Sequence, residues 1–268
     1  MKAAYLRARK RKGRFPASAG LAPTRQPSAQ SSRLGYEMMK ASIETLRILG
    51  RAIAARDHDT ASHDSRVTLY AMRLGEAAGL SDRALRRLMV GAFVHDVGKI
   101  AVPDRILRKE GPLSSEEWEI MKSHVLKGVE ILVRCDGCGW MHAAIEVVRF
   151  HHERFDGSGY PSGCAGDDIP LNARIFAIAD VFDALTTARP YKTQLSFDHA
   201  IRTMSALRNL HFDPRILDIF VRIAPGLYDR YWGEADAALE RRLDGLIARY
   251  YAKSLPETFM PGCMTRLA

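Results

Sequence analysis

Apolar side chains recur at steps of three and four residues along most of the chain, which is the spacing of one face of an α-helix. Over residues 36–56, for example, Met39, Ile43, Leu46 and Ile53 fall on one face. Helices are predicted at four further places, over residues 60–78, from 82 toward 95, over 172–187 and around 239–250. No segment shows the two-residue alternation of a β-strand and no internal repeat is present, so an all-α fold is predicted.

Polar residues mark where several of these helices begin. Ser81 precedes the apolar run that leads to His95 and is a favourable N-cap. Ser114 and Glu117 form a capping box, the paired signal of a helix N-terminus. The helix that they open is predicted to continue along one apolar stripe to about residue 132, and His124 in that stripe should face the core.

The positive charge of the chain is concentrated at its N-terminal end. Residues 1–33 contain nine Lys and Arg and no acid, which equals the net charge of +9 for all 268 residues. The remainder is therefore neutral overall. The basic segment is also rich in Ser, Ala, Gly and Pro, a composition typical of disorder. We interpret it as a solvated tail, and contact with nucleic acid or an anionic membrane is the alternative.

The length of the chain fits one large domain with appendages, or two small domains. We predict a tail at 1–35, a leading helix at 36–56, one main domain at 57–232, and a C-terminal helix and tail at 233–268. The longest purely apolar stretch covers only residues 88–94, so no membrane-spanning helix is expected. The lack of an apolar leader and the small number of cysteines favour a reducing cytoplasm.

Side chains of the type that bind metals occur in five separate fragments, two of which are the doublets His95-Asp96 and His151-His152. The complete set is His63, His95, Asp96, His124, His151, His152 and Asp180. Imidazoles and carboxylates without thiolates suit iron, manganese, nickel or zinc in a hydrolytic site. Because adjacent side chains on a helix diverge by about 100°, a doublet is predicted to address two neighbouring ions.

Taken singly, some of these residues have a purely structural explanation. A histidine such as His63 or His124 on an apolar helix face is more often a hydrogen-bonded core residue than a ligand. Asp180 falls among apolar residues, where an unpaired carboxylate is costly, and a metal ion removes that cost. It is improbable that all five fragments carry such side chains for unrelated structural reasons. A cluster of two or more ions that activates water is therefore predicted.

Two motifs carry a resemblance to a known family. Residues 95–100 read HDVGKI, which resembles the HD signature of metal-dependent phosphohydrolases. Residues 151–161 read HHERFDGSGYP, which resembles the second signature of the HD-GYP family. Further fragments follow in the order of that family: PDRIL at 103–107, MKSH at 121–124, IADVFDALT at 178–186, RPYK at 189–192 and HFDP at 211–214. The resemblance covers residues 57–220, and it is specific because many independent fragments occur in order.

The resemblance implies an HD-type helical bundle with the C-terminal helical extension of HD-GYP proteins. It implies a bacterial, cytoplasmic phosphodiesterase that hydrolyses cyclic di-GMP to pGpG, with onward hydrolysis to GMP left open. The whole ligand set would bind two or three divalent ions, iron or manganese before nickel or zinc. Asp96 would bridge two of the ions, and a hydroxide held between them would attack the phosphate.

The resemblance also assigns residues that contact the substrate. Lys99 would neutralise charge on the phosphate, and a solvated lysine after a helix end is the alternative. Arg189 and Lys192 would hold the phosphates of the substrate, and an ordinary basic turn is the alternative. Tyr160 would stack on a guanine or serve as an anchor of its loop.

One position departs from the family pattern. Some relatives carry glutamate four residues before the first histidine, where it binds a third metal, and Asp59 takes that place here. Aspartate is shorter, Asp57 and His58 are rival ligands nearby, and Asp59 is also a favourable N-cap. The number of metals is therefore left open. Asp183, one turn after Asp180, is predicted to support a ligand rather than to bind metal itself.

Two other functions compete with this interpretation. The first is a non-enzymatic signalling module that binds partner proteins through the loop around Tyr160, and it is disfavoured because the chain has lost no ligand. The second is a phosphohydrolase of another nucleotide, such as cyclic GMP-AMP or a guanosine polyphosphate. A homodimer formed through the leading helix is a further expectation.

Overall fold

The computed structural model describes residues 29–57, 61–134, 141–188 and 193–251. All regular secondary structure in this part of the chain is helical, which confirms the predicted all-α class. The α-helices are α1 (Ala29–Ala54), α2 (Ala61–Ala77), α3 (Asp82–Val94), α4 (Asp104–Leu107), α5 (Ser115–Lys122), α6 (His124–Val133), α7 (Met141–Phe150), α8 (Leu171–Thr186), α9 (Phe197–Ala206), α10 (Pro214–Tyr231) and α11 (Asp236–Tyr251). Two short 3-10 helices are η1 (Val97–Ala101) and η2 (Gly166–Asp168).

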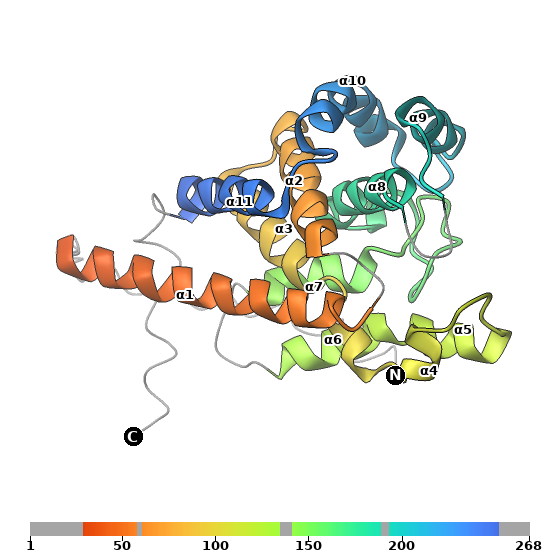
Figure 1. Ribbon diagram of the computed structural model, residues 1–268, viewed down its shortest axis with the longest axis horizontal. Coiled ribbons are helices and arrows are strands. Elements are labelled where there is room, and N and C mark those ends of the chain that lie inside the picture. The colour runs from red at the N-terminus through yellow and green to blue at the C-terminus, as the bar shows by residue number, and fades with distance from the viewer. Residues whose placement is uncertain (1–28, 58–60, 135–140, 189–192, 252–268) are drawn as a thin grey trace, which may run out of the picture.

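The core is built from α2, α3, α7 and α8, whose apolar faces meet in the middle of the molecule (Figure 1). Helix α3 packs on α7, and α2 packs on α8. Helices α10 and α11 lie against α2, and α9 lies against α8. Where α2, α8 and α10 meet, the fully buried ring of Tyr70 contacts the buried rings of Phe182 and Tyr231 edge to face.

The two ends of α1 have different surroundings. The helix begins at Ala29, before the expected start near residue 36, and its N-terminal part projects beyond the helices that it contacts (Figure 1). Its C-terminal part packs against α3, η1 and α11. Ile43, Leu46 and Ile53 are buried there, so the predicted apolar stripe is the packing face.

The helix starts predicted at Ser81 and Ser114 are confirmed. The Ser81 hydroxyl accepts a hydrogen bond from the Ala84 backbone N–H at 3.3 Å, as an N-cap does. Ser114 and Glu117 form both hydrogen bonds of the capping box at the start of α5. The segments predicted over residues 172–187 and 239–250 correspond to α8 and α11.

The single helix predicted to run on to residue 132 is wrong, because α5 and α6 separate at Ser123. The Ser123 hydroxyl donates to the Ile120 carbonyl at 2.6 Å, which closes the end of α5. The two helices also have different neighbours: α5 packs on α4, whereas α6 packs on η1 and α7. Trp118 of α5 is consequently 45% exposed, while His124 at the start of α6 is buried as predicted.

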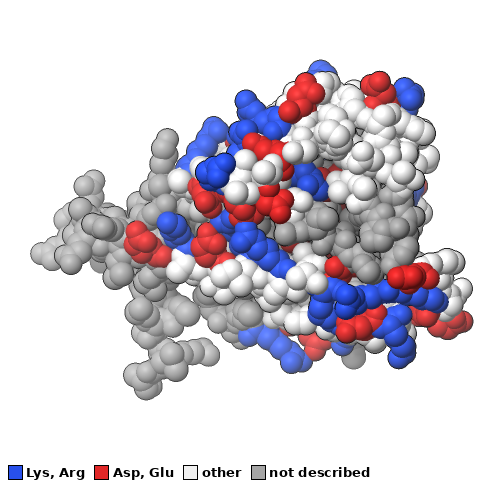
Figure 2. All heavy atoms as spheres, in the orientation of Figure 1, with Lys and Arg blue, Asp and Glu red and all other residues white. Residues whose placement is uncertain are grey.

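The face of the molecule shown in Figure 2 carries charges of both signs. Lys and Arg side chains are interspersed with Asp and Glu side chains over the face in Figure 2. Among the described helices, none has the length and apolar character that a membrane crossing requires.

Candidate metal centre

The end of α3 delivers two predicted ligands into the core. The apolar residues of α3 are buried up to Val94, and His95 follows with only 4% of its surface exposed. The chain then enters η1, which lies directly on α6. A Cβ atom at Gly98 would lie 1.8 Å from the His124 carbonyl oxygen, so only glycine allows this approach. The approach brings Asp96 next to His124.

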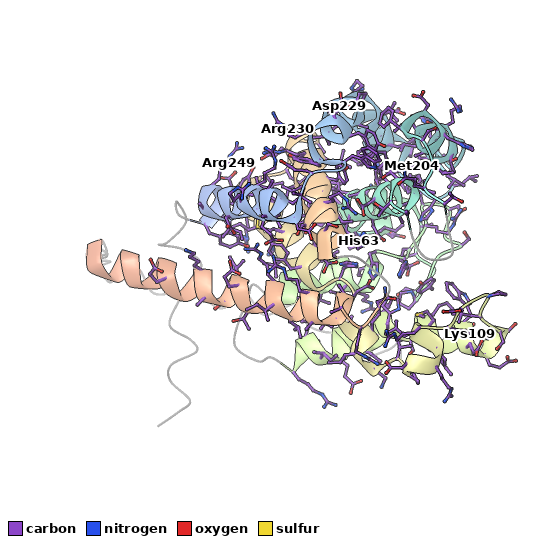
Figure 3. The ribbon with its side chains drawn as sticks, viewed as in Figure 1. His63, Lys109, Met204, Asp229, Arg230 and Arg249 are labelled. Carbon is purple, nitrogen blue, oxygen red and sulfur yellow. The ribbon has the colours of Figure 1, made fainter. Side chains whose placement is uncertain are left out.

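The seven predicted metal ligands come together in two neighbouring groups. The first ligand group consists of His63 from α2, His95 from the end of α3 and Asp180 from α8. The second ligand group consists of Asp96, His124, His151 and His152. Within each group, one candidate ligand atom from every residue lies within 4.8 Å of the others. Figure 3 shows His63 in the interior of the molecule, whereas Lys109 lies at its edge beside α5.

Asp96 lies between the two groups. Its Oδ2 atom is 3.1 Å from the Nε2 atom of His95, a member of the first ligand group. Its Oδ1 atom is 3.3 Å from the Nε2 atom of His124 and 3.9 Å from that of His151. One carboxylate therefore presents one oxygen to each group, which is the arrangement that a bridging ligand requires.

Three histidines are oriented by the same backbone contact. The Nδ1 atoms of His95, His124 and His151 lie 2.9, 2.7 and 3.0 Å from the carbonyl oxygen three residues earlier in the chain. A carbonyl oxygen can only accept a hydrogen bond, so Nδ1 carries a proton in all three rings, and in the neutral rings of His124 and His151 the Nε2 atom keeps its lone pair. In each case the Nε2 atom faces a carboxylate of the centre.

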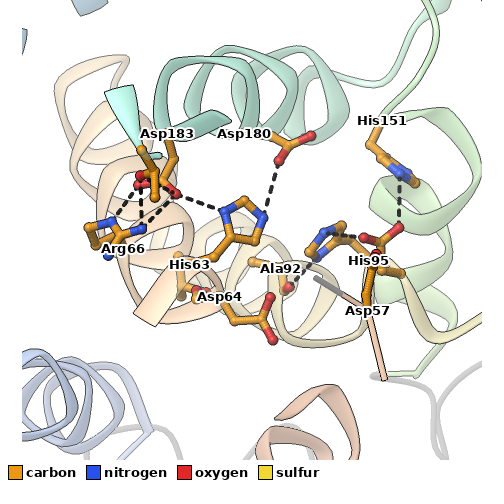
Figure 4. A network of polar contacts seen from close by, with 12 residues as sticks. Asp57, His63, Asp64, Arg66, Ala92, His95, His151, Asp180 and Asp183 are labelled. Atoms are coloured by element: carbon orange, nitrogen blue, oxygen red, sulfur yellow. Dashed lines mark hydrogen bonds and ion pairs between the residues drawn. The ribbon is translucent and has the colours of Figure 1, made fainter. Parts of the chain in front are cut away.

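His63 is oriented by side chains instead. Its Nδ1 atom donates to Asp183 Oδ2 at 2.7 Å, and its Nε2 atom lies 3.5 Å from Asp180 Oδ1 (Figure 4). Asp183 is 1% exposed and also accepts two hydrogen bonds from Arg66, at 2.6 and 3.0 Å. Asp183 thus contacts the ring from the side opposite Asp180, as expected of a residue that supports a ligand.

The electrostatics of the centre fit a bound cation. Asp96 Oδ1, His124 Nε2 and His151 Nε2 are buried and have no hydrogen-bond partner among the described residues, which is costly unless an ion binds there. Burial lowers the pKa of His151 to about 3 and also lowers the pKa values of His124 and His152, so these rings are neutral near pH 7. Burial opposes the ionisation of Asp96, but Lys99 and His95 hold its pKa well below the usual range.

The donor atoms also indicate the class of metal. Both groups offer only imidazole nitrogen and carboxylate oxygen, a mixture that suits divalent transition metals rather than calcium or a structural thiolate-bound zinc. The residues present therefore fit two neighbouring divalent ions.

A family model described as HD domain matches residues 47–216, which is more than half of the chain. The chain belongs to the HD domain family. The family resemblance predicted from the two sequence motifs is thereby confirmed.

Curated relatives cover the same region. The chain is 44% identical over 186 residues to the cyclic di-GMP phosphodiesterase response regulator RpfG of Xanthomonas campestris, a match that covers 69% of this chain and 49% of the relative. It is 40% identical over 192 residues to the 3′3′-cGAMP-specific phosphodiesterase 2 of Vibrio cholerae, covering 72% and 37%. It is 38% identical over 193 residues to a cyclic di-GMP phosphodiesterase of Thermotoga maritima, covering 72% and 52%. The chain thus spans about half or less of the length of these relatives.

Solved structures show the same fold. A cyclic GMP-AMP-specific phosphodiesterase of V. cholerae superposes with a TM-score of 0.60 at 18% identity, over 78% of this chain and 55% of that one. An HDG"Y"P protein of Bdellovibrio bacteriovorus gives a TM-score of 0.51 at 18% identity, over 73% and 68%. The fold is therefore that of an HD-domain helical bundle.

The GYP loop of this HD domain, residues 153–163 after the histidine doublet, packs against the second ligand group. The Tyr160 ring stacks on His152 with ring centroids 4.8 Å apart, and its backbone N–H donates to the His152 carbonyl at 3.2 Å. A Cβ atom at Gly159 would lie 2.4 Å from the Arg154 backbone nitrogen, so glycine is required for this tight turn. Burial raises the pKa of Tyr160, so its hydroxyl stays protonated.

Sequence reasoning missed an exposed aromatic residue at this loop. The ring of Trp118 meets that of Tyr160 edge to face at 6.1 Å, and Lys122 Nζ lies 5.8 Å from the centre of the Tyr160 ring. Trp118 lies on the apolar stripe predicted for residues 114–132, a pattern that indicates a core-facing side chain. Only the break at Ser123 turns it toward the loop and solvent.

The two histidine-containing doublets behave differently from each other. His151 and His152 leave the end of α7 together, their rings lie 4.0 Å apart, and both belong to the second ligand group. The prediction that a doublet divides between two ions is therefore wrong for this pair, because the chain has left the helix at this point. His95 and Asp96 do divide, one in each group.

Lys99 lies beside the centre rather than in solvent. Its Nζ atom is 2.7 Å from Asp96 Oδ2 and 2.7 Å from Asp57 Oδ2, and its side chain is 16% exposed. The solvated alternative is therefore wrong. Three predicted site residues, Asp59, Arg189 and Lys192, lie outside the described residues.

Proposed function

We propose that this HD domain is a metal-dependent phosphodiesterase that hydrolyses cyclic di-GMP to pGpG, with onward hydrolysis to GMP left open. The observation that carries the proposal is the pair of adjacent ligand groups joined by the two oxygens of Asp96. The names of the Xanthomonas and Thermotoga relatives support the choice of substrate.

The metal ligands we propose are the residues of both groups, with iron or manganese as the favoured ions and nickel or zinc as weaker candidates. Such ions, when bound, activate water and stabilise charge on the phosphate. Asp59 is proposed to add a third ion, because it precedes His63 by four residues. The Nδ1 hydrogen bonds keep the histidine rings fixed before the ions arrive, which lowers the cost of binding them.

The substrate contacts we propose surround the second ligand group. Lys99 would donate to a phosphate oxygen from the rim of the centre, and Arg189 and Lys192 would hold the phosphates. The Tyr160 ring contacts both His152 and Trp118, so a base of the substrate would have the rings of Tyr160 and Trp118 on which to stack.

Cyclic GMP-AMP is the second candidate substrate. The relative of V. cholerae at 40% identity is named for its specificity toward 3′3′-cGAMP. Aromatic stacking accepts any purine, so the described contacts suit both dinucleotides.

Turnover of a panel of nucleotides tests the proposal. The protein is purified without oxygen, its metals are determined by elemental analysis, and cyclic di-GMP, 3′3′-cGAMP, cyclic di-AMP and guanosine tetraphosphate are supplied separately with Mn²⁺ or Fe²⁺. We expect linear products from cyclic di-GMP above all. Preference for 3′3′-cGAMP would favour the second candidate, and a metal-loaded protein inactive on all four would favour the signalling module.

Interactions beyond the substrate remain part of the proposal. A signalling protein would bind at the GYP loop, where Trp118 is exposed. A homodimer would form through the projecting part of α1 (Figure 1). We place the protein in the bacterial cytoplasm, the compartment in which cyclic dinucleotides act.

A further inference from the structure

The segment that follows α1 contacts η1, the short helix that begins directly after Asp96, and it belongs to neither ligand group. Arg56 and Asp57 lie two and three residues after the end of α1. The Arg56 side chain contacts the backbone at the end of η1, and the Asp57 side chain contacts the Lys99 ammonium within it. Two consecutive residues thus contact both the backbone and the side chain of the same short helix.

Arg56 binds the carbonyl end of η1. Its guanidinium donates to the carbonyl oxygens of Lys99, Ile100 and Val102 at 3.2, 3.0 and 3.0 Å. Carbonyl groups at a helix end lack partners within the helix and carry partial negative charge, so a cation there is favourable. The same guanidinium donates to Asp104 Oδ1 at 2.6 Å, which fixes its orientation. The backbone of Lys99 is therefore tied to the end of α1.

Asp57 binds the other end of Lys99. The Lys99 ammonium lies between Asp57 Oδ2 and Asp96 Oδ2, 2.7 Å from each. The three side chains are 16%, 16% and 19% exposed, so water screens their interaction only partly. With cations bound at the ligand groups, Asp96 would share its charge with them, and Asp57 would be the stronger anion for Lys99.

We propose that Arg56 and Asp57 are positioning residues that hold Lys99 at the rim of the metal centre. Arg56 acts through the backbone of η1, and Asp57 acts through the ammonium. The contacts stand by themselves, and only the role of Lys99 toward a phosphate rests on the proposed function. Because both residues belong to one segment, a displacement of the end of α1 moves the Lys99 ammonium relative to Asp96.

The reactivity of Lys99 tests this inference without any catalytic assay. Full-length Asp57→Asn and Arg56→Gln proteins are labelled with an amidinating reagent, and modification of Lys99 is followed by peptide mass spectrometry. We expect the labelling rate to rise about tenfold in Asp57→Asn, since one charge-assisted hydrogen bond is lost, and to rise less in Arg56→Gln. Arg51→Gln is the matched control, because Arg51 lies on α1 and pairs with Glu240 away from the centre. Unchanged labelling in both test variants would overturn the inference.

Kinetics then separate positioning from mere stability. With metal content and melting temperature at wild-type values, kcat should fall about tenfold in Asp57→Asn while KM changes little. A fall in kcat without any rise in Lys99 labelling would overturn the positioning role. If the wild type hydrolyses no cyclic dinucleotide, the proposed function fails, and the labelling result still decides this inference. If either test variant fails to fold, Asp57→Glu and Arg56→Lys are used in its place, because they keep the charges. We expect Lys99 in these variants to be labelled faster than in the wild type and more slowly than in the unfolded protein. Lys99 labelled at the wild-type rate in Arg56→Lys, which lacks the fork of donors, would count against Arg56.

Discussion

The two ligand groups differ in how far their histidines depend on distant side chains. In the second ligand group, His124 and His151 donate to backbone carbonyls three residues earlier, a contact that needs only one helical turn. In the first, His63 donates to Asp183, which lies on another helix and is itself bound by Arg66. Local backbone therefore orients one group, whereas part of the other depends on a network of buried side chains. The first group should be easier to damage through a residue that binds no metal.

Loss of the residue shared by both groups should have the largest effect. Asp96→Ala removes one ligand oxygen from each group, so metal binding should weaken at both and turnover should fall at least about a thousandfold. Elemental analysis after dialysis and an assay of linear dinucleotide formation measure the two effects. Helicity by circular dichroism serves as the control for folding. Wild-type turnover in this variant would end the interpretation of the site as a metal centre.

Loss of Asp183 should damage the first ligand group alone. Asp183→Asn removes the negative charge that orients His63, and such changes cost about 10- to 100-fold in metal affinity. Calorimetric titration with Mn²⁺ should show one weakened site and one unchanged site. Equal weakening of both sites would contradict the division into two groups.

The same substitution also leaves Arg66 as a buried cation, which lowers stability by roughly 3–5 kcal/mol when a partner is removed. The double variant Asp183→Asn with Arg66→Met is the matched control, because it removes both charges. It should regain most of the free energy of unfolding without regaining metal affinity. Recovery of both quantities together would assign Asp183 a purely structural role.

Substitution of Arg189 or Lys192 should leave metal binding at both ligand groups unchanged. Arg189 and Lys192 are charged and cannot bind metal in that form. Arg189→Ala or Lys192→Ala should raise KM for cyclic di-GMP about tenfold, the effect of one lost hydrogen bond to a charged group, with metal content unchanged. A collapse of metal content at unchanged KM would refute the assignment.

The pH dependence of metal binding should differ between the groups. Burial lowers the pKa of His95, but the neighbouring Asp96 outweighs burial and raises it to about 10. Without a metal, the His95 ring therefore carries protons on both nitrogens below that pH. A metal at the first ligand group must displace the proton on Nε2. The metal affinity of this group should then rise up to tenfold per pH unit. The second ligand group has histidines with lowered pKa values and should show little change above about pH 6.5. Titration with Mn²⁺ from about pH 6.5 to 8.5 distinguishes the sites, and equal slopes would contradict the prediction.

Several candidate ligands could be predicted from the sequence because they stand out locally. Asp180 is a carboxylate among apolar residues of one helix, and His95-Asp96 ends an apolar run. Helix periodicity and capping boxes are likewise properties of short segments, so the boundaries of α3 and α8 agree closely with expectation.

Contacts between distant segments could not be predicted in the same way. His63 and Asp183 are 120 residues apart in the chain, and Arg56 lies 44 residues from the Ile100 carbonyl that it binds. The division of residues 115–133 into two helices depends on which neighbours each half packs against. For the same reason the apolar pattern misassigned Trp118, whose side chain faces the GYP loop rather than the core.

Removal of residues 1–28 should have the smallest effect on chemistry. This segment carries eight Lys and Arg and no acid, and it supplies no member of either ligand group and neither Arg56 nor Asp57. A protein that begins at Ala29 keeps α1 complete, so kcat and metal content should match those of the full chain. Retention on heparin or on anionic vesicles should fall, and the difference should vanish at high salt, where exposed charges are screened. A shortened protein that folds and binds metal, but whose kcat is more than about tenfold lower, would contradict this prediction. The basic segment would then take part in the reaction as a third region beside the two ligand groups.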